Sequence, residues 1–467
     1  MVEQALPYGD GAVQVELPDR TRIVGGGGPS RRSENGSTAV TASADQARDV
    51  RAAIEEPLGL PRIRDSVSAD ARVLIAFDDL TVSSFGPVRR LAIEAVLAEL
   101  AEAGVSEEQV TLICANALHR KWTTAELASA IGDDLLRRFG ARAGGLICHD
   151  AEDPESIVNL GTTKSGYDVD IHRLVVESDL TVYVNAQCHM GFAGGWKSVA
   201  VGLSTWRSIR WTHTPDGMSM SVRHNRMHEV FDEQGACIES KLGKRIFKIE
   251  TILANPTTVG RIWAGGVDET RRAALEVLEQ RHPPRRRAVT EKADVVIYGV
   301  PSWSPYATFA GMNPILTLIS SGLGYLGGYI EALGKPGCSV IITTPCPEEW
   351  DREHHAAYPE VWDRVLPETR DPYEITERFG DEFATHTGYI EQYRNGYAFH
   401  PVHAILATHP LKRLKHAARV FVAGADDPKV PEHVGFIPAA TAEDAIKEAE
   451  RIHGGECSIA CVPNALG

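Results

Sequence analysis

Short apolar runs alternate with longer segments of helical periodicity along most of this chain. The runs are rich in β-branched residues and bounded by polar ones, a pattern typical of buried strands. They occupy residues 72–77, 110–114, 146–148, 180–184, 293–300, 339–344, 419–423 and 458–462. Helices are predicted for residues 88–103, 123–139, 197–203, 271–280 and 441–452.

This alternation predicts the α/β class, with parallel sheets covered by helices on both faces. We expect two Rossmann-like domains with a cofactor site at their interface. The predicted bounds are 1–282 for an N-terminal catalytic and cofactor-binding domain, 283–290 for a basic, proline-rich linker, and 291–467 for a C-terminal domain. Near the start, residues 13–17 and 22–24 read as a hairpin, and the glycine-rich residues 25–46 as a flexible loop.

The composition and net charge of the chain indicate which kinds of molecule it is expected to bind. The chain has 467 residues, 43% hydrophobic and 24% charged, with a formal net charge of -15. An acidic protein of this kind is not expected to bind nucleic acid or an anionic membrane. The N-terminus is neither basic nor strongly apolar, and the eight cysteines include no C-x-x-C pair. These features predict a cytoplasmic protein with reduced thiols.

Chemistry-bearing residues follow three of the predicted strands. Asp79 and Thr81 come after the first, His119 after the second, and a glycine turn after the strand at 180–184. In parallel sheets, ligands bind beyond the carboxyl ends of the strands. The three regions are therefore expected to converge on one pocket.

The glycine turn contains Gly191, Gly194 and Gly195 and leads into a helix at Lys197. Exposed N–H groups at a helix N-terminus suit a phosphate. The nucleoside-triphosphatase loop needs glycine directly before its lysine, and here that residue is Trp196. The other interpretation is a tight strand-to-helix turn with a solvated lysine.

Taken in order, these motifs resemble the lactate racemase family, whose members use a nickel-pincer nucleotide. The resemblance is carried by Asp79-x-Thr81, His119-Arg120, Gly161-Thr-Thr-x-x-Gly166, Glu177-x-Asp179-Leu180, Gly191-Phe-Ala-Gly-Gly-Trp-Lys197 and His213, sixteen positions after the lysine. It extends over nearly the whole chain. The implied activity is racemisation or epimerisation at a hydroxyl-bearing carbon of a 2-hydroxy acid or a related polyol or sugar acid.

The resemblance also implies roles for single residues. Lys197 would hold the nickel-bound pyridinium mononucleotide through a covalent thioamide, and His213 would be the nickel ligand, as imidazole suits Ni(II). Asp79, Thr81 and the three turn glycines would bind the cofactor. His119 would be the first base, because histidine has a pKa near working pH. The cofactor would perform the hydride step while the protein orients the substrate.

The second base departs from the family pattern, because Gln187 stands at the family histidine position. His189 lies two residues later, an offset that moves a side chain roughly 6–7 Å along a strand. Val82 replaces a substrate-pairing arginine, and residues 301–318 lack the family lysine. The cations that could replace them are Arg207, Arg210, Arg223 and Arg226.

Other histidines and other functions stay open from the sequence. His224 and His228 stand four apart, as metal ligands on a helix do, and His400 and His403 lie in an aromatic setting that could face a cleft. The alternative functions are a non-racemising redox enzyme, a protein that binds or carries the same nucleotide, and a nickel-free nucleotide enzyme. The expected partners are a small hydroxy acid or polyol and the cofactor-assembly enzymes, and a homo-oligomer is allowed.

Overall fold

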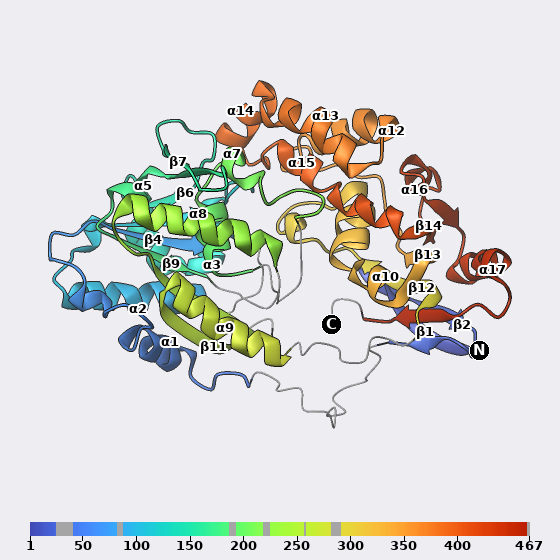
Figure 1. Cartoon of the computed structure of the whole chain (residues 1–467), viewed down its shortest axis with the longest axis horizontal. Coiled ribbons are helices and arrows are strands. Elements are labelled where there is room, and N and C mark those ends of the chain that lie inside the picture. The colour runs from blue at the N-terminus through green and yellow to red at the C-terminus, as the bar shows by residue number, and fades with distance from the viewer. Residues whose placement is uncertain are drawn as a thin grey trace. The chain divides into compact units, whose positions relative to one another are not determined.

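The computed structural model describes residues 1–24, 41–81, 87–185, 193–217, 225–255, 258–281 and 291–464. Two compact units divide the chain (Figure 1). The central unit comprises Asn35–Pro284 and Ile390–His400. The terminal unit comprises Met1–Glu34, Arg285–Tyr389 and Pro401–Gly467. The first strands belong to the terminal unit because they pair with strands formed by residues 293–301 and 459–462.

The central unit is built on a mostly parallel sheet. Its strands are β4 (Val73–Asp78), β5 (Val110–Ala115), β6 (Leu146–Cys148), β7 (Ile157–Thr162), β8 (Asp168–His172), β9 (Leu180–Val184), β10 (Phe247–Asn255) and β11 (Thr258–Gly266). Its helices are α1 (Gln46–Glu55), η1 (Ile63–Asp65), α2 (Val88–Glu102), η2 (Glu107–Gln109), α3 (Thr124–Ile131), α4 (Asp133–Gly140), α5 (Arg173–Glu177), α6 (Trp196–Gly202), α7 (Trp206–Ile209), α8 (Arg226–Leu242) and α9 (Val267–Arg281).

Six strands of this unit run in the order β11-β10-β9-β4-β5-β6, while β7 and β8 form a separate antiparallel pair. All neighbours in the six-stranded sheet are parallel except β10 and β11. Register aligns apolar side chains in rows: Ile75 lies between Leu112 and Val182, and Val182 pairs in turn with Phe247. Such rows present a continuous apolar face to the covering helices.

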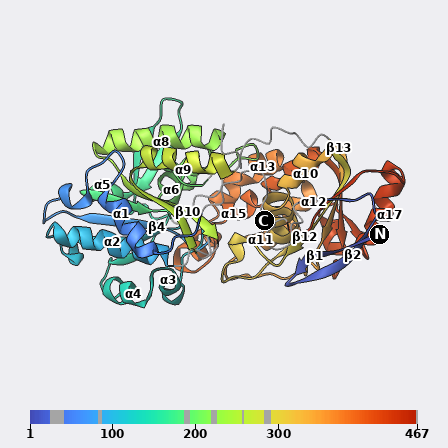
Figure 2. The same cartoon turned by 90° about the horizontal axis from the view of Figure 1, so that it is seen from below.

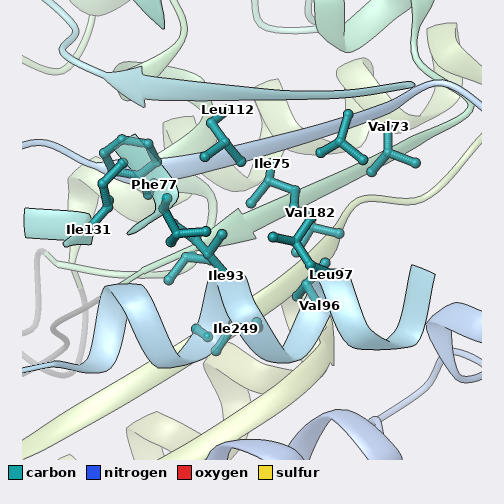
Figure 3. Packing of buried hydrophobic residues seen from close by; sticks show 14 of the residues in the cluster. Val73, Ile75, Phe77, Ile93, Val96, Leu97, Leu112, Ile131, Val182 and Ile249 are labelled. Atoms are coloured by element: carbon teal, nitrogen blue, oxygen red, sulfur yellow. The ribbon is translucent and has the colours of Figure 1, made fainter. Parts of the chain in front are cut away.

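Figure 3 shows this face packed against α2 through Ile93, Val96 and Leu97. These three side chains of α2 and the strand residues opposite them are almost fully buried. Each such side chain contributes roughly 1.5–3 kcal/mol on burial. Figure 2 shows α8 and α9 on the side of the sheet opposite to α2, α3 and α4. The sheet is therefore covered on both faces, and its strand ends carry the polar residues.

The terminal unit has a second sheet, with strands β1 (Val2–Gly9), β2 (Gly11–Leu17), β3 (Arg22–Ile23), β12 (Ala293–Pro301), β13 (Gly334–Thr343), β14 (Ala417–Ala423), β15 (Ile437–Ala439) and β16 (Ile459–Val462). Its helices are η3 (Pro305–Ala307), η4 (Ile315–Tyr325), α10 (Gly328–Leu333), α11 (Tyr358–Glu360), η5 (Val361–Val365), α12 (Leu366–Glu368), α13 (Pro372–Ala384), α15 (Val402–Leu406), η6 (His409–Lys415), α16 (Lys429–His433) and α17 (Ala442–His453). Helix α14 (Thr387–Asn395) contains the boundary between residues 389 and 390.

In this unit β12 pairs in parallel with β13, with β16 and, at its carboxyl end, with β1. The prediction that residues 13–17 and 22–24 pair with each other in a hairpin is wrong. β2 pairs antiparallel with β1, through a turn in which Gly9 has φ +56°, and β3 pairs in parallel with β16. These main-chain hydrogen bonds attach the first residues to the terminal unit.

The α/β class with parallel-rich sheets is confirmed by both units. One predicted helix is divided, since residues 123–139 form α3 and α4 on either side of Gly132, whose φ is +86°. Thr123 and Glu126 form a capping box at the start of α3. Within the described ranges, no helix combines the length and apolarity needed to cross a membrane.

Candidate active site

The carboxyl ends of β4, β5 and β9 lie side by side, because these strands are parallel and in register. Asp78 ends β4, and its carboxylate accepts hydrogen bonds from the hydroxyl of Tyr183 at 2.8 Å and the amide of Asn185 at 2.7 Å. Burial raises the pKa of Asp78, while the ammonium of Lys248 opposes the shift. Asp78 therefore links β4 to the end of β9.

Asp79, the next residue, binds the imidazole of His119. The Nδ1 atom of His119 lies 2.9 Å from one carboxylate oxygen of Asp79. Thr81 donates its hydroxyl to the other oxygen at 2.7 Å, and its own oxygen lies 3.2 Å from the same Nδ1. Asp79 and Thr81 are each 4% exposed, whereas the His119 side chain is 25% exposed. A buried carboxylate that accepts from Nδ1–H leaves the lone pair on Nε2, the arrangement of a histidine base.

The loop that carries His119 is fixed from two sides. Ala117 has φ +52°, and its N–H donates to the carbonyl of Gly202 at the end of α6. Its carbonyl accepts from the hydroxyl of Tyr393 at 3.2 Å, and the ring of Phe399 packs edge-on against His119. His400 does not face a cleft: it is 1% exposed, and its Nε2 lies 3.0 Å from Glu152.

Arg120 follows His119, and its contacts favour a role in stabilising the fold. Its guanidinium is fully buried, forms two hydrogen bonds to Glu126, and lies 4.1 Å over the ring of Trp122. Glu126 belongs to the capping box of α3, so Arg120 fixes the start of that helix to the His119 loop.

We expect Arg120→Met to lower the free energy of unfolding by roughly 3 kcal/mol, because removing one partner of a buried ion pair leaves the other uncompensated. Urea unfolding of the protein without cofactor measures this change. Arg137→Met is the matched control, because Arg137 pairs with Asp134 while its side chain is 73% exposed. An exposed pair is worth at most about 1 kcal/mol, so similar losses in both variants would contradict the assignment.

The described part of the glycine turn is strongly bent. Gly194 and Gly195 have φ +78° and +55°, and Gly195 is the residue directly before α6. The N–H of Gly195 donates to the carboxylate of Glu250 at 3.1 and 3.2 Å. From the sequence, a phosphate was expected at the N–H groups of this turn. At the Gly195 N–H, the acceptor is instead the Glu250 carboxylate. Trp196 is anchored by its indole N–H, which donates to Asp268 at 2.8 Å.

Lys197 lies on the first turn of α6, close enough to Asp78 and Asp79 for their charges to act on it. Burial lowers the pKa of Lys197, and the ammonium of Lys248 acts in the same direction. The carboxylates of Asp78 and Asp79 oppose this shift without cancelling it. The structure therefore brings Lys197 into the same charge cluster as Asp79 and His119.

His213 follows α7 in the same unit. The hydroxyl of Thr212 donates to the carbonyl of Ile209 at 2.9 Å, and its oxygen lies 3.0 Å from Nδ1 of His213. Because the hydroxyl proton is used, the oxygen accepts from Nδ1–H and the lone pair lies on Nε2. This tautomer suits an imidazole that coordinates a metal. Beside it, Thr212, Thr214 and Arg226 line a cavity of about 290 Å³.

Several predicted residues lie outside the described ranges: Val82, Gln187, His189, Gly191, Arg223 and His224. Of the candidate cations, Arg207 pairs with Asp170 at 2.9 Å, and Arg210 lies 4.0 Å from Asp168. His403 belongs to the terminal unit, where its Nδ1 lies 2.8 Å from the Tyr358 hydroxyl.

Four charged residues around the site were missed in the sequence analysis. Lys248 and Glu250 contact Gly195, Arg271 donates to the carbonyl of Ala193, and Arg89 donates to the main-chain carbonyl of Asp79 at 2.6 Å. His228 also reaches the turn, with Nε2 3.1 Å from the guanidinium of Arg271. The alternation of apolar and charged residues over Phe247–Glu250 was the one available signal for Lys248 and Glu250.

The fold and this geometry define an α/β protein in which the Asp79–His119 pair lies at adjacent strand ends and Lys197 lies on the first turn of α6. Residues 8–225 match the family model of the lactate racemase N-terminal domain. The lactate racemase of Thermoanaerobacterium thermosaccharolyticum is 24% identical over 389 residues, 81% of each chain. That of Lactiplantibacillus plantarum is 20% identical over 431 residues, 90% of this chain and 89% of the relative.

Solved structures agree in fold. The lactate racemase apoprotein from Thermoanaerobacterium thermosaccharolyticum matches with a TM-score of 0.69 and 17% identity, over 99% of this chain and 98% of that one. A protein from Thermotoga maritima matches with a TM-score of 0.54 and 14% identity, over 90% and 96%. These matches confirm the resemblance to the lactate racemase family. The likeness to lactate racemases supports a racemase, a class of isomerase.

Proposed function

We propose that this protein is a nickel-pincer nucleotide-dependent racemase or epimerase. Its substrate would be a 2-hydroxy acid or a related polyol or sugar acid, with reaction at the hydroxyl-bearing carbon. The observation that carries the proposal is the joint position of the Asp79–His119 pair, at the ends of neighbouring strands, and of Lys197, on the first turn of α6. A base and an attachment point for the cofactor thus lie in one charge cluster.

The residues present fit this cofactor. A lysine must be neutral to form a thioamide, and burial lowers the pKa of Lys197 in the required direction. His213 presents Nε2 as a nitrogen donor, which suits Ni(II). Lys197 would hold the nucleotide and His213 would coordinate the nickel. When bound, the cofactor supplies reversible hydride transfer at the substrate carbon.

His119 would be the first of the two bases and would remove the substrate hydroxyl proton through Nε2. Asp79 would stabilise the imidazolium that forms, because its carboxylate lies 2.9 Å from Nδ1. Thr81 holds the same carboxylate and keeps the ring in one orientation. These contacts favour a positioning role for Asp79 and Thr81 over direct nucleotide binding, since a carboxylate repels a phosphate.

Co-expression with the cofactor-assembly enzymes tests the proposal. We expect intact-protein mass spectrometry to show an added nucleotide, metal analysis to show nickel, and chiral chromatography to show interconversion of enantiomers or epimers in a panel of 2-hydroxy acids and sugar acids. Protein made without those enzymes is the control.

The three measurements separate the alternatives. An adduct with nickel but with no turnover of any substrate would favour a carrier protein. Oxidation of one enantiomer without formation of the other would favour a one-base redox enzyme. Absence of both adduct and nickel would overturn the cofactor assignment.

A further inference from the structure

Lys248 and Glu250 form a buried ion pair directly under the glycine turn. They occupy alternate positions of β10, so their side chains point to the same face of the sheet. Both side chains are 0% exposed, and Nζ of Lys248 lies 3.2 Å from the carboxylate of Glu250. Such burial is rare for either residue type and calls for polar partners.

The partners are the two main-chain polar groups of Gly195. Nζ of Lys248 donates to the Gly195 carbonyl at 2.6 Å and to the hydroxyl of Ser198 at 2.7 Å. The carboxylate of Glu250 accepts from the Gly195 N–H. A Cβ at Gly195 would approach Cδ of Arg271 to 3.0 Å, and its φ of +55° disfavours other residues. The pair therefore fixes the conformation of the residue two positions before Lys197.

Holding a turn does not by itself require charge. An apolar pair of similar volume is often as stable as a buried ion pair, because burying two charges costs desolvation energy. The position of the Lys248 ammonium gives a better explanation for a charged pair at this place. Lys248 bonds to Ser198, the neighbour of Lys197, and acts electrostatically on Lys197 itself.

We infer that Lys248 and Glu250 form a charged clamp that positions the glycine turn and places the Lys248 ammonium where it disfavours protonation of Lys197. This inference rests on the proposed function, which makes Lys197 the attachment point of the cofactor. In that setting Lys248 and Glu250 are positioning residues: they act on Lys197 and contact the turn that carries it.

The charges around Lys197 come from several elements. Asp78 and Asp79 at the end of β4 favour its protonated form, whereas Lys248 on β10 and burial disfavour it. Tyr183 on β9 lies under the Lys248 ammonium, with 5.3 Å from Nζ to the ring centroid, and bonds to Asp78. Around them, Arg89 on α2 binds the Asp79 carbonyl, Arg271 on α9 binds the turn at Ala193, and Glu250 pairs with Lys248 at 3.2 Å.

Competitive labelling of the cofactor-free protein with trace acetic anhydride tests the clamp. The reaction consumes the neutral amine, so peptide mass spectrometry across a pH series gives the midpoint at which Lys197 loses its proton. We expect this midpoint to lie below that of the exposed Lys164, and Lys248→Met to move it to higher pH. Ser198→Ala is the matched control: it removes a hydrogen bond of the clamp but no charge, so the midpoint should stay.

An unchanged Lys197 midpoint in Lys248→Met, or the same shift in Ser198→Ala, would overturn the inference. If Lys248→Met fails to fold by circular dichroism, Lys248→Met with Glu250→Gln removes both charges at nearly constant volume and should shift the midpoint in the same direction by less. No shift in that variant would also overturn it. The measurement needs no nucleotide, so failure of the proposed cofactor would leave its result unaffected.

Discussion

Lys197→Ala, produced together with the cofactor-assembly enzymes, is expected to have the mass of the polypeptide alone, no nickel above background and no racemase activity. Attachment needs a primary amine, and alanine provides none. Lys197 is also the lysine of the glycine turn, beside Asp78 and Asp79. Intact-protein mass spectrometry, metal analysis and chiral chromatography of one preparation measure the three losses together.

Two further variants test whether the loss of adduct, nickel and activity is due to the missing Lys197 amine. Lys164→Ala removes an exposed lysine of the same unit and should keep the adduct, the nickel and the activity. Lys197→Arg keeps a positive charge at the turn but has no amine, and should lose all three. An adduct that persists in Lys197→Ala and maps to another lysine would exclude the assigned attachment point.

The folding pattern was largely predictable where it is local. Strands β4, β5, β6 and β9 of the central sheet are mainly apolar runs, and they match the predicted segments within one residue. Strand partners were not predictable in the same way. β1 and β2 pair with each other while β3 pairs with β16, more than 400 residues later, and no local pattern encodes such a contact. The break between α3 and α4 at Gly132 was also not predicted. The apolar residues keep helical spacing on both sides of Gly132, so the pattern indicates one continuous helix.

The site residues that directly follow parallel neighbouring strands could be predicted from the sequence. Asp79, Thr81 and His119 meet because β4 and β5 are parallel neighbours, and the spacing of each residue from its strand is short. Lys248 and Glu250 were not predictable, because charged residues that alternate with apolar ones in a strand normally face solvent. Here helix α6 covers that face, and both side chains are fully buried.

The strongest expected effect on chemistry alone concerns His119. We expect His119→Gln to lower kcat by about 10²–10⁴-fold, the usual contribution of a positioned general base, while the nucleotide adduct and the nickel stay at wild-type levels. Glutamine preserves hydrogen bonding to Asp79 but cannot take a proton near neutral pH. The loss corresponds to about 3–5 kcal/mol of transition-state stabilisation.

Asp79→Asn gives an independent check on the same geometry. It keeps the imidazole but removes the charge that stabilises imidazolium, and the amide would favour the tautomer with the proton on Nε2. A large loss of kcat in both variants, with His386→Gln at an exposed histidine unchanged, would establish the Asp79–His119 pair as the base. If His119→Gln kept activity within about tenfold of wild type, proton removal would have to occur at another residue, because that loss is smaller than a general base provides.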